Sequence, residues 1–311
     1  MRRGSQRKSS NLSHIKILVL PIAILVIGGF IMTRRGSDVV SPVPKDNPET
    51  THAASVLLQK KKNPDELHDL VQTIIGTTWK NYSVYVKGLS SNFEFGINDT
   101  VMYDAASVNK IPILAALYVN AESGKVDLNK QITVQTKDIQ DYGTGTIRYE
   151  KPGGIYSLKT LARLMMQQSD NTAAYILSVY IVPTADIQKL LPSWGLTQTD
   201  MINNQTSNRD IAILLPKLLD GKIVNLALTQ ELKAFFKDTE FEDRLPSLLP
   251  KTATVYHKTG DAIATLHDVG IVEDGKLKYY IGIFTSDITD EEQTKKLMAK
   301  ISRLVYDYLK Q

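Results

Sequence analysis

A serine and a lysine three residues apart, Ser107 and Lys110, stand where a polar stretch gives way to an apolar run in the segment DAASVNKIPIL. A serine hydroxyl is a weak nucleophile until a base accepts its proton, and a lysine can be that base when burial and nearby positive charge lower its pKa. On a helix this spacing brings both side chains to one face. The pair predicts acyl transfer to Ser107, but it also fits a capping serine beside a solvated lysine. The same spacing occurs twice more near the amino terminus, at Ser5 with Lys8 and at Ser13 with Lys16.

Two further short motifs follow in the chain, Ser-Asp-Asn at 169–171 and Lys-Thr-Gly at 258–260, and each occurs once. The first falls in a break between two predicted helices, where Ser169 could simply cap a helix, and the second ends a predicted strand. The sequence has no G-x-S-x-G elbow and no Ser-His-Asp order that would supply a histidine base. Lys110 is therefore the base that we expect, and the three motifs together favour catalysis over capping.

This set of motifs, in this order, resembles the class A β-lactamases and the penicillin-binding proteins, and the resemblance extends from about residue 65 to the carboxyl terminus. It implies that Ser107 is acylated, with Lys110 as the base. It also implies that Ser169 relays a proton to the leaving nitrogen and that Lys258 supplies positive potential near both serines. These four residues are the predicted catalytic set.

The same resemblance implies a set of substrate-binding residues. Asn171 would offer its side-chain amide to the acyl chain, and Thr259 would bind the carboxylate that penicillins and D-alanyl peptides share. Gly260 would let the substrate lie along the strand as an added edge. The backbone N–H groups of Ser107 and Asp261 would form the oxyanion hole.

Four other side chains near the motifs give weaker signals. The acidic side chain of Asp261 departs from the family pattern, and we expect it to weaken the binding of an anionic substrate. Tyr142, in QDYGTG, fits either an aromatic wall of the pocket or an exposed loop. His257 should face away from Ser107 and serve a structural role. His267 fits a strand-start histidine better than a carboxylate ligand in place of an arginine.

A glutamate is missing from the loop where class A enzymes carry the one that activates the deacylating water. The segment GLTQTDMINNQTSNRD, residues 195–210, contains no glutamate. Asp200 is the nearest carboxylate, and Asp210 fits a capping box with Ser207 better than a base. We therefore expect acylation to be retained and hydrolysis of the acyl-enzyme to be slow.

The surrounding pattern predicts the elements that position these motifs. An amphipathic helix begins near Pro64, and a hairpin follows in YSVYVKGL and FEFGI. Further helices are predicted at 107–121, 158–167, 171–181, 184–191, 208–219 and 289–309, with Ser157 and Ser207 at N-cap positions. Strands are predicted in TVYHKT, HDVGIVE and KYYIGIFTS. The predicted fold class is α/β (α+β): an antiparallel sheet built from both ends of the domain, flanked by helices, with an all-helical insert.

The apolar run ILVLPIAILVIGGFIMT, residues 17–33, carries no charge and is of borderline length for a membrane span. Five basic residues precede it and two follow closely, which favours an uncleaved signal anchor with the amino terminus inside the cell. A cleaved signal with a weak site near THAAS is the alternative. We predict a cytoplasmic tail at 1–14, a transmembrane signal anchor at 15–33, an extracytoplasmic tether at 34–64 and a catalytic domain at 65–311.

Composition narrows the possible partners. The 37 basic and 33 acidic residues are spread along the chain, apart from a basic cluster at the amino terminus, which argues against a nucleic-acid partner. No cysteine is present and no two of the five histidines have H-x-x-x-H spacing, so we expect neither a metal nor another cofactor. We expect a monomer whose partners are the membrane and a small β-lactam or D-alanyl peptide substrate.

Three functions fit these observations. The chain could be a β-lactamase-like serine hydrolase with slow turnover, a peptidoglycan D-alanyl-D-alanine peptidase, for which the missing glutamate is normal, or a penicillin-binding sensor that is acylated without turnover. A sensor needs an output domain on the cytoplasmic side of the membrane, and the predicted cytoplasmic tail, residues 1–14, is too short to be one. We predict the first function, with β-lactams or related amides as substrates, because a helical insert without added domains is nearer to the β-lactamases than to the larger peptidases.

Overall fold

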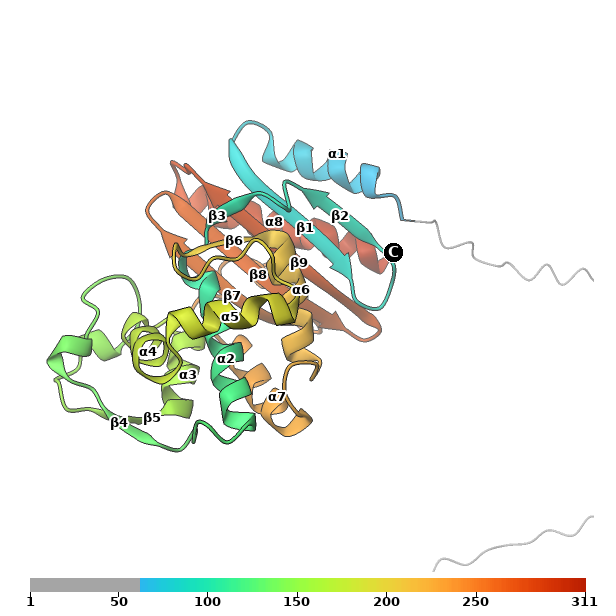
Figure 1. Ribbon diagram of the computed structural model, residues 1–311. Coiled ribbons are helices and arrows are strands. Elements are labelled where there is room, and N and C mark those ends of the chain that lie inside the picture. Colours follow the sequence, from blue (N-terminus) through green and yellow to red (C-terminus); the bar gives the residue numbers. More distant parts are fainter. Residues whose placement is uncertain (1–61) are drawn as a thin grey trace, which may run out of the picture. The chain divides into compact units, whose positions relative to one another are not determined.

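The computed structural model describes residues 62–311, which include every predicted site residue (Figure 1). The predicted cytoplasmic tail, the predicted membrane anchor and the predicted tether up to residue 61 lie outside the described residues, so they stay predictions. Among the helices of 62–311, none combines the length and the apolar character that a membrane crossing needs.

A five-stranded antiparallel sheet in the order β2-β1-β9-β8-β7 forms the base of the domain. Its strands are β1 (Asn81–Gly88), β2 (Glu94–Ile97), β7 (Thr254–Ala262), β8 (Thr265–Asp274) and β9 (Leu277–Ser286). Strand β1 pairs with β9 along its whole length, with Tyr85 opposite Gly282, which confirms that both ends of the domain build one sheet. Successive side chains of β1 point to opposite faces, and both faces are buried, because Val84 and Tyr85 belong to two different apolar clusters.

Helices α1 (Pro64–Ile75) and α8 (Glu291–Lys310) cover one face of the sheet (Figure 1). Each begins after a residue whose side chain accepts a bond from a backbone N–H of the first turn, Asn63 for α1 and Asp290 for α8. Leu67 of α1 and Ile301 of α8 lie in the same apolar cluster as Val84. The apolar faces of α1 and α8 are therefore the faces that pack against the sheet.

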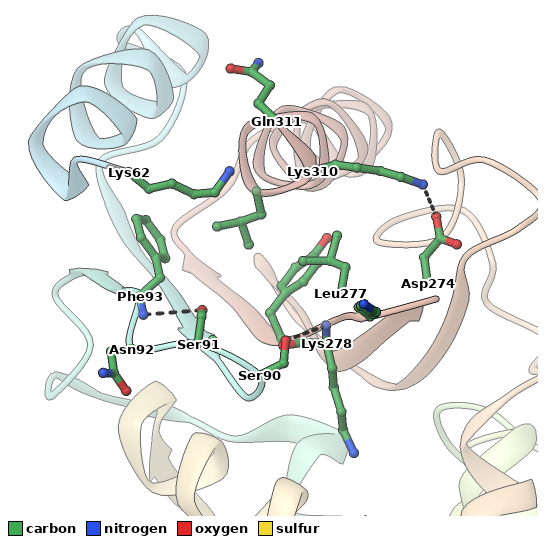
Figure 2. Close-up of a pocket in the computed structure, with 14 residues that line it drawn as sticks. Lys62, Ser90, Ser91, Asn92, Phe93, Asp274, Leu277, Lys278, Lys310 and Gln311 are labelled. Carbon is green, nitrogen blue, oxygen red and sulfur yellow. Dashed lines mark hydrogen bonds and ion pairs between the residues drawn. The ribbon is translucent and has the colours of Figure 1, made fainter. Parts of the chain in front are cut away.

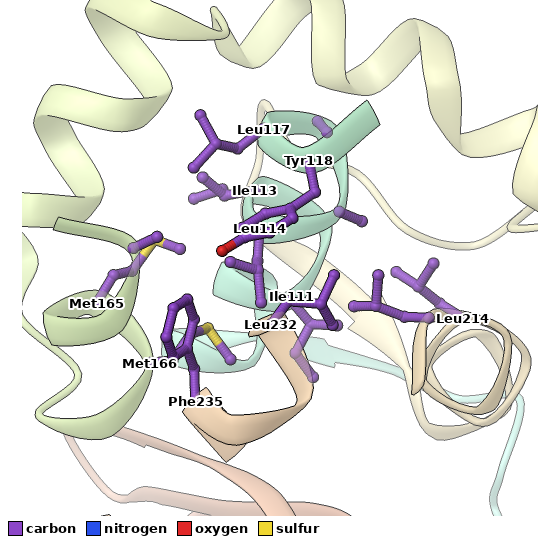
Figure 3. Close-up of a cluster of buried hydrophobic side chains, with 14 of the residues drawn as sticks. Ile111, Ile113, Leu114, Leu117, Tyr118, Met165, Met166, Leu214, Leu232 and Phe235 are labelled. Atoms are coloured by element: carbon purple, nitrogen blue, oxygen red, sulfur yellow. The ribbon is translucent and has the colours of Figure 1, made fainter. Parts of the chain in front are cut away.

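The other face of the sheet carries the helical part of the domain. Its helices are α2 (Lys110–Glu122), α3 (Leu158–Gln167), α4 (Asn171–Ile176), α5 (Thr184–Trp194), α6 (Asn208–Leu219) and α7 (Leu226–Lys233). Figure 3 shows Leu114 of α2 with Met166 of α3, Leu214 of α6 and Leu232 of α7 around it. A helix enclosed by others is apolar on every side. Lys110 is the first residue of α2 and is buried with it, so the position of Lys110 is set by the packing of this helix.

Two helices predicted from the sequence, 158–167 and 208–219, are confirmed to the residue, and Ser157 and Ser207 accept the predicted capping bonds. The helix predicted from residue 107 begins instead with a 3-10 turn, Ala106–Asn109, so Ser107 precedes α2. The predicted helix 171–181 is α4 followed by a π-helical turn, Leu177–Ile181, and α5 extends beyond the predicted end at residue 191.

Helix α7 and two pairs of three-residue strands are absent from the prediction. The strands are β3 (Met102–Asp104) with β6 (Gln205–Ser207) and β4 (Gln131–Thr133) with β5 (Ile155–Ser157). Three further 3-10 turns lie at Thr136–Asp138, Ile147–Tyr149 and Ala234–Phe236. Strands this short have no readable alternation, because their pairing arises only when segments distant in the sequence meet.

Candidate active site

Ser107 lies on the 3-10 turn Ala106–Asn109 and lines a cleft of about 80 Å³. The structure brings residues of all three motifs together in this cleft, along with a loop before α3 and one aromatic side chain. The lining residues are Ser107, Gly143, Thr144, Ser169, Asn171, Phe241, Thr259 and Asp261. The S-x-x-K motif therefore starts a buried helix and opens on a cleft, which a solvated capping pair would not do.

Polar contacts brace the turn that carries Ser107. Ala106 has a φ of 46°, a left-handed conformation that is uncommon for alanine, and its N–H donates to Asp104 Oδ1 at 3.0 Å. Asn204 donates through Nδ2 to the same oxygen at 3.1 Å, and its Oδ1 accepts from Asn109 Nδ2 at 3.1 Å. Loop 200–205 thus supports the turn of the predicted nucleophile.

The amine of Lys110 lies among three acceptors: Ser169 O at 2.5 Å, Ser169 Oγ at 3.1 Å and Asn171 Oδ1 at 2.8 Å. Burial lowers the pKa of Lys110 well below its usual value, and the positive charge of Lys258 lowers it further, against the opposing effect of nearby aspartates. A lysine with a lowered pKa can serve as a general base near neutral pH. The contacts of this amine are with the second motif, so Lys110 links the start of α2 to Ser169.

Ser169 lies between two lysines. Its Oγ is 3.1 Å from Lys110 Nζ and 3.0 Å from Lys258 Nζ, and Lys258 also donates to Thr259 O at 2.8 Å. Burial lowers the pKa of Lys258 to about 7, although Asp261 and Asp268 act in the opposite direction. A hydroxyl can accept one hydrogen bond while it donates another, so Ser169 can pass a proton between the two amines.

The Ser-Asp-Asn segment is held as a sharp turn between α3 and α4. Ser169 has a φ of 54°, and Asp170, not Ser169, caps α4 by accepting from Ala173 N at 2.8 Å. Asp170 also accepts from Ile147 N at 3.0 Å. The loop before it passes so close that a side chain at Gly145 would meet the Asp170 carboxylate at 2.2 Å. The second glycine in QDYGTG, Gly145, is required by this close approach.

Strand β7 brings Thr259 and Asp261 to the cleft, as predicted for substrate-binding residues. Gly260 is buried between them, and a side chain there would meet Ala105 O and Val108 Cγ2, both at 3.1 Å. This glycine therefore lets β7 pack against the turn that carries Ser107. The contact is an additional reason for glycine at this position beside the predicted approach of the substrate.

Tyr142 does not line the cleft with its side chain. The ring is 64% exposed, which fits the exposed-loop alternative rather than the predicted pocket wall. Its backbone oxygen accepts from Asn171 Nδ2 at 3.1 Å. The contribution of residue 142 to the site is therefore to orient the amide of Asn171 through the main chain.

Both histidines near the third motif have structural contacts. His257 is buried with Nδ1 2.8 Å from Asp268 Oδ1 and Nε2 3.3 Å from Glu242 Oε1, and these carboxylates raise its pKa to about 9 despite burial. His267 is also buried, which lowers its pKa to about 4, and Nε2 lies 2.7 Å from Asp104 O. His267 therefore contacts the segment that precedes Ser107. Neither histidine lines the cleft.

A sequence model described as the beta-lactamase enzyme family matches residues 66–309. The chain belongs to this family. The resemblance inferred from the three motifs is thereby confirmed, and so is its extent from about residue 65 to near the carboxyl terminus.

Named relatives agree with the family and with the predicted fold. A β-lactamase from Bacteroides uniformis is 26% identical over 243 residues, 68% of this chain and 81% of that protein. The β-lactamase SME-1 from Serratia marcescens is 22% identical over 241 residues, 71% of this chain and 81% of that protein. A solved variant of PBP-A, an acyl-enzyme complex with penicillin G, is 26% identical with a TM-score of 0.73 over 79% of this chain and 97% of that one. The extended-spectrum β-lactamase TLA-1 shares the fold at 20% identity, with a TM-score of 0.75 over 80% of this chain and 100% of that one.

The two carboxylates of segment 195–210, Asp200 and Asp210, both accept from backbone N–H groups of residues 197–203. Asp200 accepts from Ile202 N at 2.8 Å and from Asn203 N at 3.0 Å, and these bonds lower its pKa. Asp210 accepts from Gln198 N and Thr199 N, both at 2.8 Å. Neither residue lines the cleft.

The capping box predicted for Ser207 and Asp210 is half correct. Ser207 Oγ accepts from Asp210 N at 3.1 Å, as predicted. The Asp210 carboxylate, however, accepts from the amides of 197–199, because the loop folds back over the first turn of α6 and offers it three N–H groups.

Besides Gly143 and Thr144 of the QDYGTG loop, Arg244 and Phe241 are site residues that the sequence did not indicate. Phe241 lines the cleft, and Arg244 is buried beneath it with both terminal nitrogens on the Asp261 carboxylate. No local pattern marks either residue, since both lie in a segment without regular structure between the last 3-10 turn and β7. The basic residue that balances Asp261 is seventeen positions before it in the chain.

A larger pocket, with a volume of about 630 Å³, lies elsewhere on the domain (Figure 2). It is lined by the β1–β2 turn, the β8–β9 turn and the end of α8, and Figure 2 shows Phe93 and Leu277 on its walls with Lys62 and Lys310 near its rim. No residue of the three motifs lines it, so its size does not make it the site of the chemistry.

Proposed function

We propose that this protein is a membrane-anchored, extracytoplasmic serine hydrolase that accepts the acyl group of a β-lactam or related amide on Ser107 and releases it slowly. The observation that carries this proposal is that Ser107 and Ser169 line one cleft, and that two buried lysines bond to Ser169, in a chain of the beta-lactamase enzyme family.

Acylation needs the following proton movements. Lys110, whose pKa is lowered by burial and by the positive charge of Lys258, accepts the proton of the Ser107 hydroxyl while Oγ bonds to the carbonyl carbon. The backbone N–H groups of Ser107 and Asp261 stabilise the oxyanion. As the carbon–nitrogen bond breaks, the proton passes from Lys110 through the Ser169 hydroxyl to the leaving nitrogen, and the ester on Ser107 remains. The 3.1 Å distance from Lys110 Nζ to Ser169 Oγ supports this relay.

Slow deacylation is proposed because, among the described residues that line the cleft, no carboxylate is free to activate the hydrolytic water. Asp200 and Asp210 accept from backbone amides of residues 197–203, and the carboxylate among the lining residues, Asp261, is paired with Arg244. The similarity to PBP-A, a variant of which has been solved as an acyl-enzyme with penicillin G, supports a long-lived ester.

A peptidoglycan D-alanyl-D-alanine peptidase is the second candidate, and the similarity to a protein named as penicillin-binding favours it. The same serine and lysines would form the acyl-enzyme in that reaction. Product analysis separates the two candidates: a peptidase releases D-alanine from a D-alanyl-D-alanine peptide faster than it opens a β-lactam. A penicillin-binding sensor would give an ester and no product with either compound.

The test of the proposed function is a stopped-flow assay with a chromogenic cephalosporin. We expect a burst close to one equivalent of enzyme and then a slow steady rate, because a covalent intermediate that outlives its formation accumulates. Rapid linear turnover without a burst would contradict slow deacylation. Absence of any reaction with β-lactams and peptides alike would contradict the whole proposal.

The proposed location rests on the apolar run 17–33 and the basic residues before it. External protease on intact cells is expected to release a soluble fragment that begins within 34–64, because that segment is polar and rich in proline. A domain that stays protected until the cells are lysed would contradict an extracytoplasmic location.

A further inference from the structure

We propose that the Asp261–Arg244 pair makes this cleft select acyl donors that carry no free carboxylate on the leaving-group side of the scissile amide. The inference rests on the proposed function, because it concerns which compounds acylate Ser107. It assigns a specificity role to the side chain of Asp261, a residue that contributes only its backbone N–H to the proposed oxyanion hole.

The geometry of the pair is that of a completed ion pair. Arg244 Nη1 donates to Asp261 Oδ1 at 2.5 Å and Nη2 donates to Oδ2 at 2.8 Å, a bidentate arrangement in which one carboxylate occupies the face of the guanidinium that a second carboxylate would need. The side chain of Arg244 is 1% exposed, whereas that of Asp261 is 36% exposed and lines the cleft. The cleft therefore meets the carboxylate, and the guanidinium lies behind it.

The rest of the guanidinium is also directed away from the cleft. Nη1 donates to His267 O at 2.9 Å, and Nε lies 3.4 Å from the exposed carboxylate of Asp243. Burial alone would lower the pKa of Arg244, and the bonds to Asp261 outweigh it, so the guanidinium stays charged and committed to its partner.

The neighbouring lysines direct their hydrogen bonds to groups other than the Asp261 carboxylate. Lys258 directs its amine to Ser169 Oγ at 3.0 Å and to Thr259 O at 2.8 Å, and Lys110 directs its amine to Ser169 and Asn171. A substrate carboxylate placed beside Thr259 would thus meet a carboxylate of the same sign, which disfavours binding. An ester, an amide or a continuing peptide chain at that position avoids the repulsion, and an N–H group there gains an acceptor.

The favoured substrate class is therefore an amide whose leaving side is neutral, such as a D-alanyl unit within a longer or amidated peptide. Penicillins and terminal D-alanyl-D-alanine peptides carry the carboxylate and are expected to acylate Ser107 less efficiently than their neutral counterparts. This preference is the reverse of what a cleft with an exposed arginine would show.

The experiment compares penicillin G with its methyl ester. The second-order rate constant for acylation of Ser107 is measured by intact-protein mass spectrometry, and each constant is divided by that compound's rate of alkaline hydrolysis to remove intrinsic reactivity. In the unaltered protein we expect the ester to react at least tenfold faster than the acid. In Asp261→Asn, which removes the charge and keeps the shape, we expect the ratio of acid to ester to rise at least tenfold.

Asp243→Asn is the matched control. It removes the same charge beside the same guanidinium, but its carboxylate does not line the cleft, so the acid-to-ester ratio should change less than twofold. Equal normalised rates for acid and ester in the unaltered protein would overturn the inference even if Asp261→Asn fails to fold. An unchanged ratio in a folded Asp261→Asn protein would overturn it as well. Labelling of Ser107 by both compounds without discrimination refutes this inference alone, whereas no labelling by either refutes the proposed function too.

Discussion

Two adjacent residues on β7, His257 and Lys258, are both fully buried, yet their pKa values shift in opposite directions. The pKa of His257 rises to about 9 and that of Lys258 falls to about 7. The difference lies in the two faces of the strand. His257 faces the carboxylates of Asp268 and Glu242, whereas Lys258 faces a hydroxyl and a carbonyl oxygen.

The comparison teaches that burial alone does not decide the charge of a group. Burial disfavours the charged form on both faces, and a carboxylate within hydrogen-bonding distance reverses that effect on one of them. The carboxylate face holds a group that is cationic at neutral pH, and this cation has a structural role. The face toward Ser169 holds amines that can exchange a proton, which is what acyl transfer requires.

The largest expected effect is on the proton-exchanging face. Ser107→Ala should abolish the mass adduct formed with the methyl ester of penicillin G, because no acyl acceptor remains. Lys110→Ala should slow adduct formation by about 10²- to 10⁴-fold, the usual range for a lost general base. The rate is followed by intact-protein mass spectrometry. An adduct that persists in Ser107→Ala would show that Ser107 is not the acyl acceptor, and would contradict the assignment of acyl transfer to the face toward Ser169.

On the carboxylate face, Asp268→Asn should lower the free energy of unfolding by about 3–5 kcal/mol, because it leaves a buried imidazolium without its main partner. Urea unfolding measures the change. Glu242→Gln is the matched control, since that carboxylate is 47% exposed and should contribute less than about 1 kcal/mol. Equal losses in the two variants would show that His257 is not held by Asp268.

The two faces should also oppose each other in the pH dependence of stability between pH 7 and 9. His257 binds a proton more tightly in the folded state, so its stabilisation is complete below pH 6.5 and is lost as pH rises through about 9. Lys258 binds a proton less tightly in the folded state, so between about 7 and its unfolded value of 10.5 the unfolded state holds the extra proton, and stability rises with pH.

Removing either residue should therefore reveal the pH dependence of stability that the other residue contributes. Relative to the unaltered protein, Lys258→Met should make the free energy of unfolding fall with pH, and His257→Gln should make it rise, each by up to about 1.4 kcal/mol per pH unit. Urea titrations at pH 7, 8 and 9 provide the slopes. Slopes of the same sign in both variants would contradict the opposed shifts.

The smallest expected effect is at the first turn of α8. Asp290 accepts from Gln293 N at 2.8 Å and caps α8, so Asp290→Ala should lower the free energy of unfolding by about 1 kcal/mol. The acylation rate of Ser107 should stay within twofold of its original value, because α8 packs on the face of the sheet opposite the helical part. A large loss of acylation would show that the two faces of the sheet are coupled.

The sequence was most informative where a local rule applies. Ser157 and Ser207 mark the starts of α3 and α6 to the residue, since a capping side chain acts on the next three residues of its own chain. The order of the three motifs identified the family, which the match over residues 66–309 confirms. The strands predicted in TVYHKT, HDVGIVE and KYYIGIFTS are also confirmed, as parts of β7, β8 and β9.

Other features could not be predicted because their partners are distant in the chain. Asp210 has a place in a capping box by spacing, but its carboxylate accepts from loop amides that fold back on it. Ser107 precedes α2 on a 3-10 turn that loop 200–205 supports through Asn204. Short strands such as β3 and β6 form for the same reason.

By itself, the sequence determined which side chains are the candidates for the chemistry, because serine, lysine and glycine at fixed local spacings define the three motifs. Only the tertiary structure decided the electrostatics of those side chains. A pKa depends on what lies within a few ångströms, and the charges around Lys258 and Asp261 come from Asp268 and Arg244, on other segments of the chain. The arginine behind Asp261 is the clearest case, since no spacing in the sequence indicates that the cleft presents a carboxylate whose counter-ion is buried beneath it.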